Sequence, residues 1–199
     1  MREISNVQQW EAQLETMRKE MGTLKAAGAW RSGPRTLLRQ LGLHQNELML
    51  CRALAWILTP DAWHSLGDRF VRGLLLRLGL SAEDADQAQI SIEEVRGGTR
   101  ADIVIRTSKA TVVIEAKVSA PEAPEQCDRI AEAWRDEDPE LLFLSPAGLS
   151  PVSAIRSYDE WHAISWREIS ALAESALGAG TSPETGEVDF IRTIKIYGG

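Results

Sequence analysis

The sequence predicts an α/β fold in which a mixed central sheet is flanked by helices, with extra helices at the N-terminus. In the first third of the chain, apolar residues recur every three or four positions, which is the period of a helix with one apolar face. Between residues 90 and 114 the pattern changes to short β-branched runs separated by turn residues, which is typical of strands in hairpins. Helical and strand patterns then alternate, so we expect helices packed against one sheet.

The helical patterns end at residues that disfavour helix. The first pattern covers residues 5–28 and is followed by Arg31-Ser32-Gly33-Pro34. The next two patterns are separated by Thr59-Pro60-Asp61, because proline lacks a backbone N–H and disfavours helix just before it. Helices after the first are predicted over 44–58, 66–78, 124–134, 167–177 and 188–197.

Three predicted strands follow one another as a meander. Their apolar residues lie at Ile90 to Val95, Ile103 to Ile105 and Val112 to Ile114. The separating residues are Gly97-Gly98 and the four residues 107–110, both typical of hairpin turns. Two further strands are predicted at 141–144 and 162–165.

The size and composition indicate one globular domain. A chain of 199 residues with 44% hydrophobic and 26% charged residues can bury one core without disulfides or a structural metal. Within it we expect an N-terminal helical extension over 1–40, the core over 41–170 and a C-terminal helical decoration over 171–199. Cys51 and Cys127 follow no metal-ligand spacing, which excludes a zinc finger. No apolar run is long enough to span a membrane and no secretion signal is evident, so we expect a cytoplasmic protein without a membrane partner.

The charge is unevenly distributed along the chain. The net charge of −7 argues against a broad basic face of the kind that binds nucleic acid. Residues 1–60, however, carry a net +3, whereas residues 121–199 carry a net −9. Phosphates are therefore expected to approach the N-terminal part, where Arg31, Arg35 and Arg39 lie. The alternative is that these arginines are only solvent-exposed residues of a helix.

The most informative residues lie on the second and third predicted strands. Because strand side chains alternate between faces, Glu115 and Lys117 share one face. A hairpin turn centred on Ser108-Lys109 pairs residues whose numbers sum to 217, which places Asp102 opposite Glu115. Two carboxylates whose Cβ atoms are roughly 5 Å apart repel each other, and a divalent cation would compensate them. The alternative is that Asp102 only begins a strand and that Glu115 and Lys117 form an exposed pair.

With a cation in place, this arrangement suits phosphodiester hydrolysis. Lys117 would lie about 7 Å further along the strand than Glu115, beside the metal and its water. The metal would neutralise developing charge and activate water, and the lysine would position or deprotonate that water.

These residues resemble the PD-(D/E)XK nuclease superfamily over about residues 40–170. Asp102 matches the first motif position, and Glu115-Ala116-Lys117 matches the acidic residue, any residue and lysine of the second. The resemblance implies a restriction-endonuclease-like α-β-β-β-α-β core and a nuclease that uses Mg²⁺ or Mn²⁺ to cut nucleic acid, DNA before RNA. It also implies the Ala116 carbonyl as a metal ligand. The sequence departs from the pattern in having Ala101 for proline and Ile130 for an aromatic residue.

The resemblance extends to three residues of the bacterial branch, namely Glu47, Arg100 and Gln126. Glu47 also lies on the apolar face of its predicted helix, so it either reaches a cation or the active-site water or is an acidic residue in the first turn after the Asn46 cap. Arg100 would contact the scissile phosphate or balance a nearby glutamate. Gln126 would reach the metal-bound water or a phosphate, or be solvated.

Partners are less constrained by the sequence. Many members of the superfamily dimerise, and the amphipathic N-terminal helix could provide such an interface, with another copy or with a partner protein. A second class of function is a nuclease-like fold that has lost activity, or requires a partner, and acts as a binding or assembly module. Intact Asp102, Glu115 and Lys117 argue against it, whereas the acidic C-terminal part offers few phosphate contacts.

Overall fold

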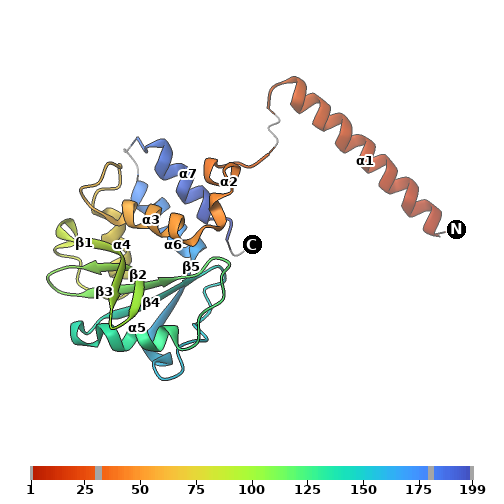
Figure 1. Ribbon diagram of the computed structural model, residues 1–199. Helices are drawn as coiled ribbons and strands as arrows, with labels where there is room; N and C mark the ends of the chain where they lie inside the picture. The colour runs from red at the N-terminus through yellow and green to blue at the C-terminus, as the bar shows by residue number, and fades with distance from the viewer. Residues whose placement is uncertain (1, 30–32, 179–181, 198–199) are drawn as a thin grey trace. The chain divides into compact units, whose positions relative to one another are not determined.

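The computed structural model describes residues 2–29, 33–178 and 182–197. The chain forms two compact units, Met1–Arg35 and Thr36–Gly199. The first unit contains the helix α1 (Arg2–Ala26), where the sequence predicts a helix over 5–28. The second unit is a sheet between helices, which confirms the predicted α/β fold (Figure 1).

The sheet has five strands among the described residues, in the order β1-β2-β3-β4-β5. The first three strands are antiparallel neighbours, and β3, β4 and β5 run parallel. The predicted meander is therefore followed by two parallel strands, which makes the sheet mixed. The strands are β1 (Gln89–Arg96), β2 (Thr99–Arg106), β3 (Thr111–Ala116), β4 (Glu140–Ser145) and β5 (Trp161–Ser165).

Both hairpins have the geometry that their turn residues predict. Gly97 and Gly98 have φ values of +53° and +76°, which a two-residue turn of type I′ requires and glycine adopts without strain. In the second hairpin Ile103 pairs with Ile114 and Arg106 with Thr111, so paired numbers sum to 217 as predicted. The register that relates β2 to β3 is thus set by the turn between them.

Helices cover both faces of the sheet (Figure 1). One face borders a larger core to which four helices contribute, and the other packs against α5 (Gln126–Trp134). Strand residues alternate accordingly, with Ile103 and Ile114 in the larger core and Val104 and Val113 in the smaller core beside α5. The four helices of the larger core are α3 (Glu47–Leu58), α4 (Arg69–Arg77), α6 (Trp166–Leu177) and α7 (Thr185–Ile194).

The helix boundaries differ in part from those predicted. The pattern over 44–58 begins as a 3-10 turn at Leu43–Gln45, and α3 begins only after Asn46, whose side chain caps it by accepting from the Met49 N–H. A short helix α2 (Leu37–Gln40) was not predicted. Further 3-10 turns lie at Ala85–Gln87, Arg135–Glu137 and Tyr158–Glu160. In the described part of the chain, no helix is both long and apolar enough to cross a membrane.

Candidate active site

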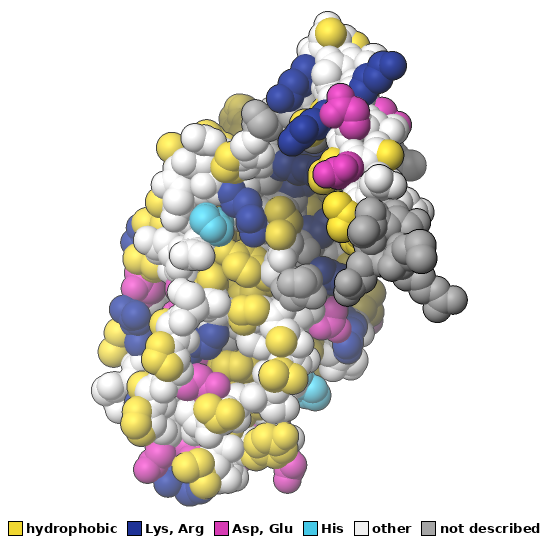
Figure 2. All heavy atoms as spheres, turned by 90° about the vertical axis from the view of Figure 1, so that its right-hand side faces the viewer, with side chains coloured by type: hydrophobic (Ala, Val, Ile, Leu, Met, Phe, Trp, Pro, Cys, Tyr) yellow, Lys and Arg dark blue, Asp and Glu magenta, His cyan; other side chains and the backbone are white. Residues whose placement is uncertain are grey.

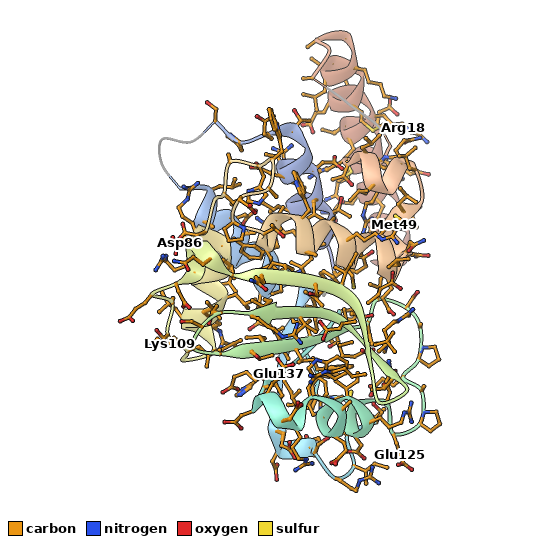
Figure 3. All side chains as sticks on the ribbon, turned by 60° about the vertical axis from the view of Figure 1, so that its left-hand side comes forward. Arg18, Met49, Asp86, Lys109, Glu125 and Glu137 are labelled. Carbon is orange, nitrogen blue, oxygen red and sulfur yellow. The ribbon has the colours of Figure 1, made fainter. Side chains whose placement is uncertain are left out.

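The candidate site lies at one end of the sheet. The N-terminal ends of α3 and α5, marked by Met49 and Glu125 in Figure 3, lie at this end, whereas Lys109 marks the β2–β3 turn at the other. A pocket of about 420 Å³ opens here and is lined mainly by polar residues. Its lining includes Glu47, Thr99, Arg100, Asp102, Glu115, Lys117, Gln126 and Arg129.

Asp102 lies where the β2–β3 ladder ends. The last backbone pair before it is Ile103 with Ile114, and beyond this pair the Asp102 carboxylate accepts a hydrogen bond from the Ala116 N–H at 2.8 Å. The carboxylate thereby takes the place of a backbone acceptor. Burial raises the pKa of Asp102, although the Ala116 N–H and Lys117 act in the opposite direction.

Glu115 is the most deeply buried acid of the pocket, with 1% of its side chain exposed. Its Oε1 accepts hydrogen bonds from the Lys117 ammonium and, at 2.6 Å, from the Gln126 amide. Its Oε2 is buried and has no hydrogen-bond partner among the described residues. Burial and the Asp102 charge raise the pKa of Glu115 to about 8. A buried acceptor of this kind is unfavourable unless something else occupies the site.

Lys117 follows β3 directly and is held from three sides. Its backbone N–H donates to the Leu144 carbonyl at 2.7 Å, and its own carbonyl accepts from the Trp166 indole at 2.9 Å. Its ammonium contacts Glu115 and lies 3.8 Å from a Glu47 oxygen. Burial alone would lower the pKa of Lys117, but the surrounding carboxylates outweigh it and raise the pKa, so the side chain remains a cation.

Glu47 faces Lys117 from the first turn of α3. It is the first residue of α3, after the Asn46 cap, and its Oε2 accepts from the Val118 N–H at 3.1 Å. Its Oε1 is the oxygen that faces Lys117. The helix therefore brings a third carboxylate to the ammonium from outside the sheet.

Helix α5 and the β1–β2 hairpin complete the rim. Gln126 is the first residue of α5, and its amide oxygen accepts from the Ala123 N–H at 3.2 Å while its NH₂ group donates to Glu115. Arg100 lines the pocket and pairs with Glu93 at 2.9 Å, with 58% of its side chain exposed. Arg129 also lines the pocket, although it is not among the residues predicted from the sequence. Its spacing of three residues from Gln126 on one helix would have indicated it.

The remaining predicted phosphate contacts are Arg31, Arg35 and Arg39. Arg39 is on α2 and is not among the described residues that line this pocket. Arg35 belongs to the first compact unit, and Arg31 lies outside the described residues.

Comparison with known protein families identifies the fold. A family model of the PD-(D/E)XK nuclease superfamily matches residues 37–193. The chain belongs to this superfamily. No curated protein and no solved structure matches the chain significantly. The superfamily consists generally of nucleases, so a nuclease-type function is indicated.

The two departures from the superfamily pattern are both core residues. Ala101 and Ile130 are fully buried in the smaller core, beside α5. The positions that carry proline and an aromatic residue in the pattern therefore serve packing here, and the charged positions of the motif remain at the pocket.

The donor atoms at the pocket suit a hard divalent cation. Glu115 Oε2, which no described residue contacts by a hydrogen bond, and the Asp102 carboxylate are oxygen ligands of the kind that Mg²⁺ prefers. Mg²⁺ retains water and phosphate oxygens as its other ligands. Within the described ranges, no group of three or more His, Cys, Asp and Glu side chains surrounds one point. A cation here would therefore have few side-chain ligands, which is compatible with Mg²⁺ bound to substrate.

Proposed function

We propose that the protein is a metal-dependent nuclease that hydrolyses phosphodiester bonds of nucleic acid, preferentially DNA, at the pocket of Asp102, Glu115 and Lys117. The observation that carries the proposal is a buried Glu115 oxygen that has no hydrogen-bond partner in the described part of the chain and lies beside a second carboxylate and a lysine ammonium. Such a group is costly in a purely structural role and is useful at a cation-binding site.

The residues present fit Mg²⁺ or Mn²⁺. Asp102 and Glu115 would hold the ion, with the Ala116 carbonyl and Glu47 as further candidate ligands. When bound, the ion supplies neutralisation of phosphate charge and activation of a water molecule. The proposal covers a mechanism with one ion or with two.

Lys117 would act on the attacking water and on the phosphate. As a cation held against Glu115, it can orient a water by hydrogen bonding and stabilise the charge that develops on the phosphate. Glu47 would position Lys117, because its second oxygen is fixed by the Val118 N–H. Gln126 would orient Glu115 or the water through its NH₂ group.

Substrate binding would rely on the rim of the pocket. Basic, acidic and hydrophobic side chains are interspersed on the face shown in Figure 2, in line with the net charge of −7. Arg100 and Arg129, at the pocket itself, are therefore our first candidates for phosphate contacts, and Arg35 and Arg39 are further ones.

The proposal is tested by nicking of a supercoiled plasmid in the presence of Mg²⁺ or EDTA. We expect cleavage with Mg²⁺, none with EDTA, and a reduction of at least about a hundredfold in Lys117→Ala, the scale of one lost electrostatic or proton-transfer contribution. Lys109→Ala is the matched control, because Lys109 is exposed at the far end of the sheet.

Two outcomes contradict the proposal. Cleavage by Lys117→Ala at the rate of Lys109→Ala would remove Lys117 from the mechanism. DNA binding without cleavage under all metal conditions would instead select the inactive or partner-dependent binding module. Replacing the plasmid by single-stranded RNA of matched length tests the preference for DNA.

A further inference from the structure

Helix α1 carries an apolar stripe with a strict seven-residue repeat. Its apolar positions alternate spacings of three and four from Val7 to Leu24. This repeat averages 3.5 residues per turn, whereas a single straight helix has 3.6. Such a stripe continues to face one partner only if two helices wind around each other as a left-handed coiled coil. The stripe consists of Val7, Trp10, Leu14, Met17, Met21 and Leu24.

The stripe is exposed within its own unit. Trp10 and Met17 have 67% and 64% of their surface exposed, and Val7, Leu14 and Leu24 are also exposed. From residue 7 onward, most other side chains of the helix are polar, with the charged residues Glu11, Glu15, Arg18, Lys19, Glu20 and Lys25. A contiguous apolar stripe on an otherwise polar helix is typical of a protein interaction surface.

The charges beside the stripe complement a second copy of the same helix. With Val7, Leu14 and Met21 at the first core position of each repeat, Glu20 and Lys25 flank the core on opposite sides. In a parallel, in-register pair, Glu20 of one helix faces Lys25 of the other, and this contact occurs twice by symmetry. The preceding contact joins Gln13 and Arg18, so no like charges meet.

We propose that two copies of the chain associate through α1 as a parallel coiled coil with this stripe as its core. The acidic residues among the flanking charges disfavour a nucleic-acid or anionic-lipid surface as the occupant, because phosphate surfaces repel them. The proposal concerns α1 alone and does not rest on the nuclease activity. A dimer would carry two of the candidate sites.

The test is the oligomeric state of the full chain, measured by sedimentation equilibrium. Concentrations of about 1–100 µM are used, because we expect a dimer dissociation constant of micromolar order. We expect a dimer for the natural sequence and a monomer for the double variant Leu14→Asp, Met17→Asp. The matched control is Gln9→Asp, Thr16→Asp, which adds the same charges to the opposite, exposed side of α1 and is expected to remain dimeric. Far-UV circular dichroism and thermal unfolding of the sheet domain confirm that each variant is folded.

A charge exchange tests the partner and its direction. Glu20→Lys alone and Lys25→Glu alone each bring like charges together in a parallel pair, and we expect the dimer dissociation constant to rise about tenfold for each. Mixing the two single variants restores opposite charges at both contacts, as does the double exchange within one chain.

Three results overturn the proposal. These are a monomer at the highest concentration, a dimer that survives Leu14→Asp, Met17→Asp, and dimer affinity that is unaffected by the charge exchange. The first would assign the stripe to a different protein, the second would place the dimer interface outside α1, and the third would exclude the parallel alignment.

Discussion

Glu115 is buried beside Asp102, so ionisation of its carboxyl group is unfavourable in the metal-free protein. Its pKa is raised from 4.5 to about 8 by burial and by Asp102, so between these pH values the folded state binds more protons than the unfolded state. The free energy of unfolding of the metal-free protein is therefore expected to fall as the pH rises through this window. In Glu115→Gln this contribution disappears, and the variant should gain stability relative to the natural sequence toward pH 8.

Urea unfolding in EDTA at pH values from about 5 to 8 measures this difference. Glu132→Gln, on the exposed side of α5, serves as the control and should follow the natural sequence. Parallel stability curves for Glu115→Gln and the natural sequence would refute the raised pKa.

Arg129 is expected to contact substrate phosphate from the rim of the pocket. Its guanidinium donates to the Pro124 carbonyl of the same helix start, and its side chain remains exposed. Arg129→Ala should weaken DNA binding at all sequences and reduce the slope of log affinity against log salt by about one. Fluorescence anisotropy in Ca²⁺ at several salt concentrations measures both quantities.

Arg135→Ala removes an equal charge just beyond the other end of α5, where Arg135 pairs with Glu132. A similar loss of affinity in both arginine variants would mean that only the overall charge of the protein matters. Arg129 would then have no specific role.

Among the elements, the two hairpins and the alternation of strand side chains could be predicted from the sequence, because neighbouring residues determine them. The turns at 97–98 and 107–110 fix the two hairpins, so the register that relates Asp102 to Glu115 follows from the sequence. The spacing of Glu115 and Lys117 likewise follows from strand alternation.

Contacts between distant segments could not be predicted in this way. Helix α2 begins where the Asp189 carboxylate of α7 accepts from the N–H groups of Leu37 and Leu38, at 2.7 and 3.2 Å. Glu47 meets Val118 across 71 positions of sequence. Asp189 and Val118 are each far in sequence from the residues that they contact. Only tertiary packing brings them together, so the sequence pattern does not indicate these contacts.

Asp128 makes another such contact, and we expect it to contribute strongly to stability. From α5, its buried carboxylate accepts from the N–H groups of Ile155, Arg156 and Ser157 and, at 2.8 Å, from the Ser157 hydroxyl. Asp128→Ala would leave these donors without an acceptor and should lower the free energy of unfolding by about 3 kcal/mol. Glu132→Ala, exposed on the same helix, should change it by less than about 0.5 kcal/mol. Equal denaturation midpoints for the two variants would show that the contacts of Asp128 with residues 155–157 do not contribute to stability.

At the scale of the whole molecule, the sheet brings the candidate site together from four elements. β2 supplies Asp102, β3 with the residue that follows it supplies Glu115 and Lys117, and helices α3 and α5 supply Glu47 and Gln126. These residues span 80 positions of the chain, and only the fold places their side chains around one pocket. This pocket is the proposed binding site of a divalent cation.

The most direct measurement is the anomalous difference density of a crystal soaked in MnCl₂, with Lys117 and both carboxylates unchanged. We expect a peak between the Asp102 and Glu115 carboxylates, in contact with the Glu115 oxygen that has no hydrogen-bond partner among the described residues, and no peak there in a crystal of Glu115→Gln. A crystal with ordered Asp102 and Glu115 side chains and manganese bound only elsewhere would contradict this expectation.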